Sequence, residues 1–148
     1  MNTIPVLLTI VMALPVQSLA QNNLGATPQP KTIGEAVGLY AGAVTYMQVL
    51  KSSPCGTLIK RPSPDLDQVI RHEILPLFPA SQKHEVAEVL SSLKQQMWHQ
   101  GQATFETTYN YYSREEGLDH NTICGYMAGS GIALLKLTKE AMIHISKK

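Results

Sequence analysis

Cysteine and histidine are the residue types in this chain that are best suited to metal or nucleophilic chemistry. The chain has two cysteines, at 55 and 124, and five histidines: His72, His84, His99, His120 and His144. A metal site needs side chains that converge, and residues four apart on a helix share a face. His120 and Cys124 have this spacing, but Cys124 cannot bind a metal if it forms a disulfide. No H-E-x-x-H motif occurs, so we expect surface histidines and no metal site.

Haem is a second chemistry that a helical protein can hold. Covalent attachment requires Cys-x-x-Cys-His, which is absent. Non-covalent haem would need an axial pair such as Met47 or Met97 with His99 or His144. Methionine at core spacing more often fills gaps between helices, so we expect no cofactor. A helical cavity that binds a hydrophobic ligand or haem is the alternative to a protein-binding function.

Acid–base catalysis needs a carboxylate pair, or a nucleophile beside a base. The only adjacent carboxylates are Glu115 and Glu116, in the segment SREEGLD, which is typical of a solvated helix end followed by a turn. The G-x-S-x-G motif is absent, and no glycine-rich phosphate loop stands between a strand and a helix. We therefore expect no enzyme. An activity that uses His120 and Glu116 is the least favoured alternative.

The stretch from 107 to 112 has the most unusual local composition. It holds Tyr109, Tyr111 and Tyr112, three of the six tyrosines, and Trp98 lies upstream. Tyrosine and tryptophan are enriched at binding hot spots because they bury a large area with few torsions to freeze. One interpretation is packing at the edge of the core. The other is an aromatic surface for a partner protein, made by Trp98, Tyr109, Tyr111 and Tyr112.

The first 20 residues are predicted to be a signal peptide that is cleaved. An apolar run from Ile4 to Val16 is followed by Ser18 and Ala20, small residues at the two positions that signal peptidase reads. No Lys or Arg precedes the run, which departs from the usual pattern. The run is too short to span a bilayer comfortably, so we expect no stable membrane insertion. The predicted location is the periplasm or the exterior.

If the protein is exported, its two cysteines are expected to be oxidised to a disulfide. An even count in an oxidising compartment favours a disulfide, here Cys55–Cys124. It would close a loop of about 70 residues, and the chain-entropy model gives such a loop roughly 4.4 kcal/mol of stabilisation. Residues 21–31 are polar and contain Pro and Gly, which predicts a flexible segment. Residues 32–148 then form a single helical domain.

Helical periodicity predicts four helices, and no segment alternates like a strand. Their approximate ranges are 32–52, 64–79, 81–112 and 121–146. Thr32 and Glu35 predict a capping box for the first helix. Ser63 as N-cap and Pro64 at the first position predict the start of the second. The expected fold class is an all-α bundle of four to five helices.

The lengths and faces of these helices predict their arrangement. A single third helix of 32 residues would be about 48 Å long, more than a compact domain needs, so we expect a bend or break near Gly101. The fourth helix is apolar on several sides, so we expect it to be central and well buried. The disulfide would join the end of the first helix to the start of the fourth. It therefore favours antiparallel packing of these two helices.

Both of these helices carry glycines at four-residue spacing: Gly34, Gly38 and Gly42 in the first, and Gly125 and Gly129 in the fourth. Glycine inside a helix costs about 1 kcal/mol against alanine, and close approach of another helix would offset that cost. Packing within the chain is the favoured interpretation. A seat for a partner helix, including a homodimer, is the alternative.

The charge balance excludes one class of partner. Twelve Lys and Arg stand against eleven Asp and Glu, for a formal net charge of +1. A protein that binds nucleic acid through electrostatics would carry a basic stripe. The sequence therefore predicts a small exported helical protein that acts by binding another protein and does not bind nucleic acid.

In size, export, helical content and paired cysteines, this outline is similar to that of two groups of periplasmic proteins. One group is the pilotins, which bind a segment of a secretin. The other is the immunity proteins that neutralise a cell-wall-degrading effector. The resemblance covers no sequence motif and transfers no site residue. It implies a periplasmic adaptor or chaperone, or an inhibitor.

Overall fold

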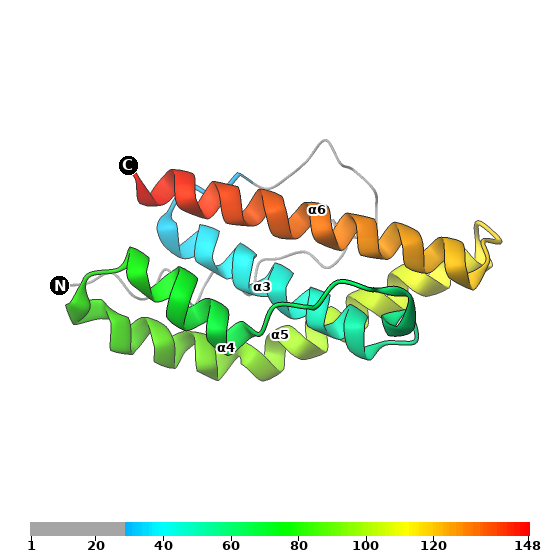
Figure 1. The fold of residues 1–148 in the computed structure, drawn as a ribbon, viewed down its shortest axis with the longest axis horizontal. Coiled ribbons are helices and arrows are strands. Elements are labelled where there is room, and N and C mark those ends of the chain that lie inside the picture. Colours follow the sequence, from blue (N-terminus) through cyan, green and yellow to red (C-terminus); the bar gives the residue numbers. More distant parts are fainter. Residues whose placement is uncertain (1–28) are drawn as a thin grey trace.

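The structure is a computed structural model that describes residues 29–148. The chain forms only helices in that range, so the expected all-α fold is confirmed (Figure 1). In chain order the elements are α3 (Ile33–Ser52), η1 (Gly56–Leu58), α4 (Leu66–Val69), η2 (Ile70–Ile74), η3 (Leu75–Leu77), α5 (Ala80–Arg114) and α6 (His120–Ser146). The predicted signal peptide, residues 1–20, lies outside the described residues, as do residues 21–28 of the expected flexible segment.

Helix α3 is the centre of the bundle. Thr32 caps its N-terminus, because the Thr32 side chain accepts a hydrogen bond from the Glu35 N–H. The predicted capping box is only half formed, since the Glu35 carboxylate accepts from the N–H of Lys31 and not from that of Thr32. Buried residues lie on all sides of the helix, which packs against both α5 and α6. The sequence predicts this central, buried position for the fourth helix, not for the first.

Helix α6 lies at the outside of the bundle, so the expectation of a central fourth helix is wrong. Its buried residues recur at helical spacing along one side: Ile123, Cys124, Met127, Gly131, Thr138 and Met142. Its other side includes the exposed apolar residues Leu137 and Ile143. Helix α6 has apolar residues on several sides, but α3 covers only one of its faces. The other apolar residues of α6 are therefore not buried by α3.

The second helical segment begins later than predicted. Asp65, not Ser63, is the N-cap, and its carboxylate accepts from the Asp67 N–H. Helix α4 is one turn long and continues into the π-helical turn η2 and the 3₁₀ turn η3. Pro76 lies in η3, where it lacks the N–H that an α-helix would use. The segment ends at this turn, close to the predicted end at residue 79.

Of the bend or break that was expected near Gly101, the break is wrong, because helix α5 is uninterrupted. It has 35 residues, about 52 Å at 1.5 Å per residue. Gly101 is buried against α3, and a Cβ there would lie 2.9 Å from Cγ2 of Val49. The glycine therefore lets the two helices approach closely.

The predicted disulfide is present, with the Cα atoms of Cys55 and Cys124 5.3 Å apart. It ties the chain just after α3 to the first turn of α6, and these helices run antiparallel as expected (Figure 1). Both sulfurs are buried. None of the helices in residues 29–148 has the length and apolar character needed to cross a membrane.

Candidate functional site

The predicted tyrosines lie at one end of the bundle, where α5 ends and α6 begins. Tyr111 is 46% exposed, whereas Tyr109 and Tyr112 are half-buried. Tyr126 of α6 joins them and is 56% exposed. We call Tyr109, Tyr111, Tyr112, Tyr126 and His120 the tyrosine patch. Sequence patterns do not indicate that Tyr126 belongs to the patch, because the register between the two helices depends on how they pack.

The rings of the tyrosine patch form two groups: Tyr111, Tyr112 and Tyr126 in one, and Tyr109 and His120 in the other. Tyr111 meets Tyr112 edge to face at 5.5 Å between ring centroids, and Tyr112 meets Tyr126 at 6.0 Å. Tyr109 lies 5.7 Å from the His120 ring, and its hydroxyl is 2.6 Å from Nδ1 of His120. These contacts join the end of α5 to the start of α6. The exposed rings of Tyr111 and Tyr126 are therefore held in place by contact with the half-buried ring of Tyr112.

The loop between the two helices fixes this arrangement. Gly117 has φ of +63°, a left-handed conformation that glycine adopts without strain. The Leu118 N–H donates to the carbonyl of Tyr112, so the loop is tied to α5. Asp119 then caps α6, because its carboxylate accepts from the N–H and the hydroxyl of Thr122. Hydrogen bonds to Thr122 lower the pKa of Asp119.

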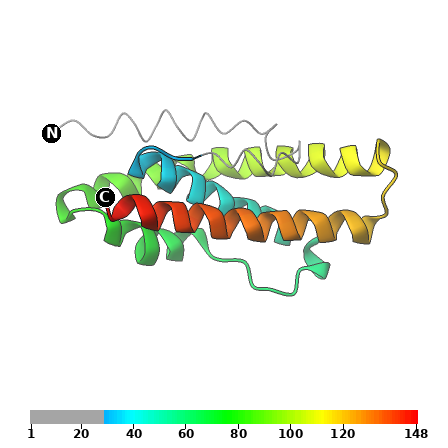
Figure 2. The same cartoon turned by 90° about the horizontal axis from the view of Figure 1, so that it is seen from above.

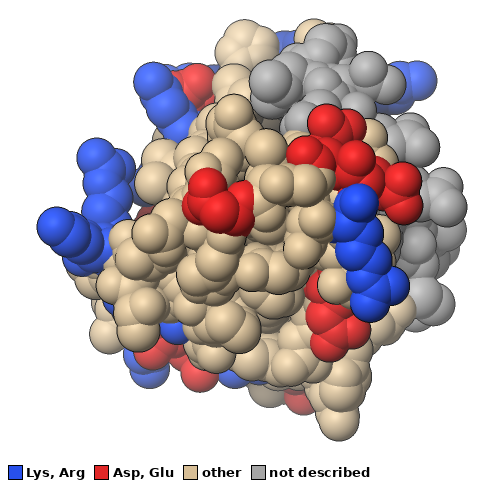
Figure 3. Space-filling model, turned by 90° about the vertical axis from the view of Figure 1, so that its right-hand side faces the viewer, with Lys and Arg blue, Asp and Glu red and all other residues tan. Residues whose placement is uncertain are grey.

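Acidic side chains border the patch. The Tyr111 hydroxyl donates to Oε1 of Glu116 at 3.1 Å, and this hydrogen bond, together with the charge of Glu116, raises the pKa of Tyr111. The loop also carries Glu115 and Asp119, both exposed. Figure 3 looks onto this end of the molecule, where acidic and basic side chains lie among and beside a mainly uncharged surface. A partner surface of complementary charge would suit this border.

The residues that suggested metal or acid–base chemistry are engaged in other contacts. The His120 ring lies 3.7 Å from Sγ of Cys124, as the spacing predicted, but that sulfur is bonded to Cys55. His120 is paired with Tyr109, whereas Glu116 is paired with Tyr111. Over residues 29–148 no group of three His, Cys, Asp or Glu side chains is placed to hold a metal ion.

Trp98 is not brought to the tyrosines. It lies 11 residues before Tyr109 in α5, about 16 Å along the helix axis. Trp98 is half-buried and lines a separate open groove with Gln48 of α3, Lys94 of α5 and Asp67 of α4. Lys94 and Asp67 form an ion pair there. Of the four predicted aromatic residues, the three tyrosines therefore lie in the tyrosine patch, and Trp98 lies in a separate groove.

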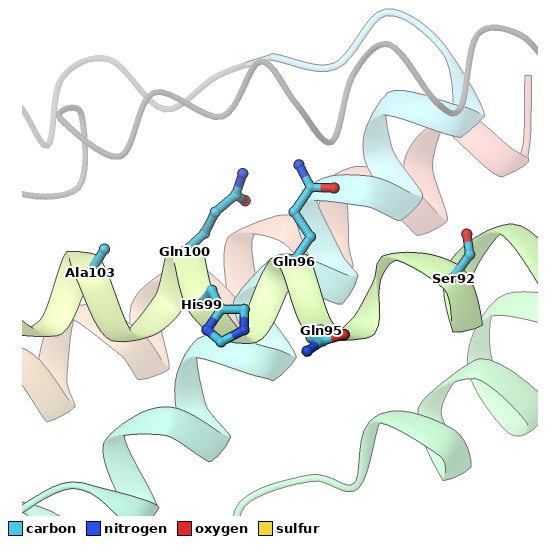
Figure 4. Close-up of a pocket in the computed structure, with 6 residues that line it drawn as sticks. All are labelled: Ser92, Gln95, Gln96, His99, Gln100 and Ala103. Atoms are coloured by element: carbon cyan, nitrogen blue, oxygen red, sulfur yellow. The ribbon is translucent and has the colours of Figure 1, made fainter.

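A further depression, separate from the groove at Trp98, follows the outer side of α5. Figure 4 shows the residues that line it, in which Gln96 and Gln100 point to one side of the helix, and Gln95 and His99 to another. His99 is exposed, whereas Met97 is buried in the core. These two suggested haem ligands therefore do not face a common space.

A small cavity lies behind the tyrosine patch. Its volume is about 30 Å³, and its lining includes Tyr46, Thr108, Tyr112 and Ser130. Burial raises the pKa of Tyr46 to about 12. The Thr108 hydroxyl is buried and has no hydrogen-bond partner among residues 29–148. Because a cavity of this size holds one water molecule, it suits a bridging water and is too small for haem or a lipid.

A charged cluster far from the patch was not predicted by the sequence. The buried Tyr40 of α3 donates its hydroxyl to Oε2 of Glu73 at 2.7 Å, and Nζ of Lys139 lies 2.7 Å from the same oxygen. Burial alone would raise the pKa of Glu73, but hydrogen bonds from Lys139 and Tyr40 outweigh it and lower the pKa. The cluster joins three elements and is structural in character.

The chain matches no protein-family model, no curated protein and no solved structure.

Proposed function

We propose that the protein acts by binding another protein through the tyrosine patch. The observation that carries the proposal is the pairing of exposed rings with supporting rings. Tyr111 and Tyr126 are 46% and 56% exposed, and half-buried Tyr112 lies in ring contact with both. Aromatic side chains held in place bury a large area at little entropic cost, and this is the property of a binding hot spot.

The rigidity of the surroundings supports the same proposal. Beneath the patch, the disulfide links the first turn of α6 to the chain after α3. The tight loop at Gly117 holds the end of α5 against α6. A surface that is already ordered before binding loses less conformational freedom when the partner docks.

The setting that we propose is the periplasm or the cell exterior. A disulfide that joins buried cysteines persists in an oxidising compartment and is uncommon in the cytosol. The predicted signal peptide at residues 1–20 points to the same place. In that setting an adaptor or chaperone of the pilotin kind, or an inhibitor of the immunity-protein kind, would use such a surface.

Site-specific photo-crosslinking in the native host tests the proposal. A photoreactive phenylalanine analogue replaces Tyr111 in one variant and Ile143, an exposed residue near the far end of α6, in the control. We expect one discrete crosslinked protein from position 111 and none from position 143. The same products from both positions, or none from either, would contradict the proposal.

Affinity for the crosslinked partner then gives the energetic test. We expect Tyr111→Ala to weaken binding by 1 kcal/mol or more, about fivefold, as for a hot-spot residue. Ile143→Ala is the matched control and should bind like the unaltered protein. Titration calorimetry with the purified partner measures both. Equal affinity of Tyr111→Ala and the control would remove Tyr111 from the interface.

A further inference from the structure

Helix α6 presents a row of small and apolar residues that no other part of the described chain covers. Gly125, Gly129, Ala133 and Leu137 follow one another at four-residue spacing, and all four are exposed. Tyr126 flanks the row and is 56% exposed, and Leu137 is 43% exposed. In Figure 2, which is seen from above, no other described helix lies over α6.

The glycines of this row differ from the glycines that pack inside the protomer. A Cβ at Gly101 would lie 2.9 Å from Cγ2 of Val49, and one at Gly131 would lie 2.6 Å from the sulfur of Met47. A Cβ at Gly125 or at Gly129 would meet no atom of the described residues within 4 Å. Each of these two glycines destabilises the helix by about 1 kcal/mol relative to alanine. Nothing within residues 29–148 offsets that cost by close packing.

The row is complementary to itself in size when two copies run antiparallel. If the twofold axis passes beside Ala133, Gly129 of one copy lies opposite Leu137 of the other, because each is four residues from the axis. The exposed Leu137 side chain then fills the open space above Gly129. Ala133 meets its own symmetry mate, where a small side chain permits close approach. Twofold symmetry makes each such contact occur twice.

The charges favour the same antiparallel arrangement. The start of α6 follows Glu115, Glu116 and Asp119, and the chain ends in Lys147 and Lys148. With the axis at Ala133, Asp119 of one copy lies opposite Lys147 of the other. A parallel pair would bring the acidic ends together and the basic ends together, which costs free energy.

We infer that two copies of this chain associate antiparallel along the Gly125–Leu137 face of α6. The exposed apolar area, the open space above the glycines and the opposed charges all fit a second copy of the same helix. In such a dimer the two tyrosine patches point away from each other at opposite ends. Tyr126 borders both surfaces, but each protomer keeps Tyr111 free for a partner, and the dimer does not rest on the proposed function.

Oligomeric state over a protein concentration series tests the inference. For protein purified from its native compartment, we expect light scattering to show a shift from one to two protomer masses as concentration rises. Ala133→Arg places two like charges at the axis and should raise the dimer dissociation constant at least tenfold. Arginine is a good helix former, and position 133 is exposed, so the protomer should stay folded.

Gln102→Arg is the matched control, because Gln102 is an exposed residue on α5 and the change adds the same charge. It should leave dimerisation unchanged. A protein that stays monomeric at every concentration would overturn the inference. So would a dimer that Ala133→Arg and Gln102→Arg weaken equally, or that neither weakens.

Crosslinking reports the register directly. We expect Ala133→Cys to form an intermolecular disulfide under mild oxidation, because residues at the axis face each other, and Gln102→Cys to form none. Peptide mapping confirms that Cys55 and Cys124 remain paired. A dimer in which Ala133→Cys gives no crosslink would overturn the proposed register. Tyr111→Ala should still dimerise, so a failed partner assay is distinguishable from a failed dimer.

Discussion

Glu73 shows how a single residue can connect elements that are distant in the chain. It belongs to the π-helical turn η2, and its carboxylate accepts hydrogen bonds from Tyr40 of α3 and Lys139 of α6. Thirty-three residues separate it from Tyr40. An ionised carboxylate with two such partners is held in its charged form more firmly than in the unfolded chain. Its protonation state is therefore linked to stability.

The sign of that linkage follows from the lowered pKa of Glu73. The group stabilises the fold fully above its unfolded pKa, and this contribution is lost as the pH falls through its lower folded pKa. Urea unfolding at a series of pH values measures the effect. We expect Glu73→Gln to reduce stability near neutral pH and to flatten its acid dependence. Glu106→Gln, at an exposed position on α5, is the control, and an equal effect of both would contradict the prediction.

At the scale of elements, glycine has opposite consequences on α5 and α6. Gly101 lies where α5 meets α3, and Val49 occupies the space that a Cβ would need. Valine is stiff at χ1 and Val49 is buried, so it yields little. Gly125 faces open space on α6. The same residue type therefore permits helix packing in one place and leaves a bare surface in the other.

This difference predicts opposite effects of the same substitution. We expect Gly125→Ala to raise the free energy of unfolding by up to about 1 kcal/mol through helix propensity. Gly101→Ala should lower it, because the steric cost of displacing Val49 by overpacking is about 1–3 kcal/mol. Thermal and urea unfolding at a dilution where the protein is monomeric measure both. If Gly101→Ala were the more stable of the two, the close packing of α5 on α3 would be wrong.

At the scale of the whole molecule, the disulfide and the core act on different parts of the bundle. One apolar cluster includes Ile74, Leu90 and Met142, and a second cluster nearer the tyrosine patch includes Leu50 and Ile123. The Cys55–Cys124 bond belongs to the second region, since it joins the end of α3 to the start of α6. It therefore holds the end of the bundle that carries the tyrosine patch.

Loss of this bond should reduce the stability of the whole domain. The bond spans 69 residues of sequence, for which the chain-entropy model gives roughly 4.4 kcal/mol. We expect the double variant Cys55→Ala, Cys124→Ala to lose about 4 kcal/mol in urea unfolding, with an unchanged helical spectrum below the transition. Reductant should destabilise the unaltered protein by a similar amount and leave the double variant unchanged. A loss below 1 kcal/mol would show that the unfolded chain is not constrained by the bond.

Local patterns were enough to predict the three long helices α3, α5 and α6 and the disulfide, whereas the second helical segment begins later and is less regular than predicted. Helical periodicity and the Thr32 cap predicted α3, and the cysteine count predicted the bond that makes α3 and α6 antiparallel. The tyrosine-rich stretch identified most of the candidate site. These features depend on neighbours in sequence, or on the chemistry of one residue type, so no knowledge of packing was needed.

Only the tertiary structure decided which helix is central, that α5 continues through Gly101, and that Tyr126 joins the patch while Trp98 does not. Each of these depends on which faces meet and in what register. Hydrophobic burial is non-directional and favours several arrangements of the same apolar faces. Close packing of side chains such as Val49 against Gly101 then selects one of them, and no local segment of the sequence contains that information.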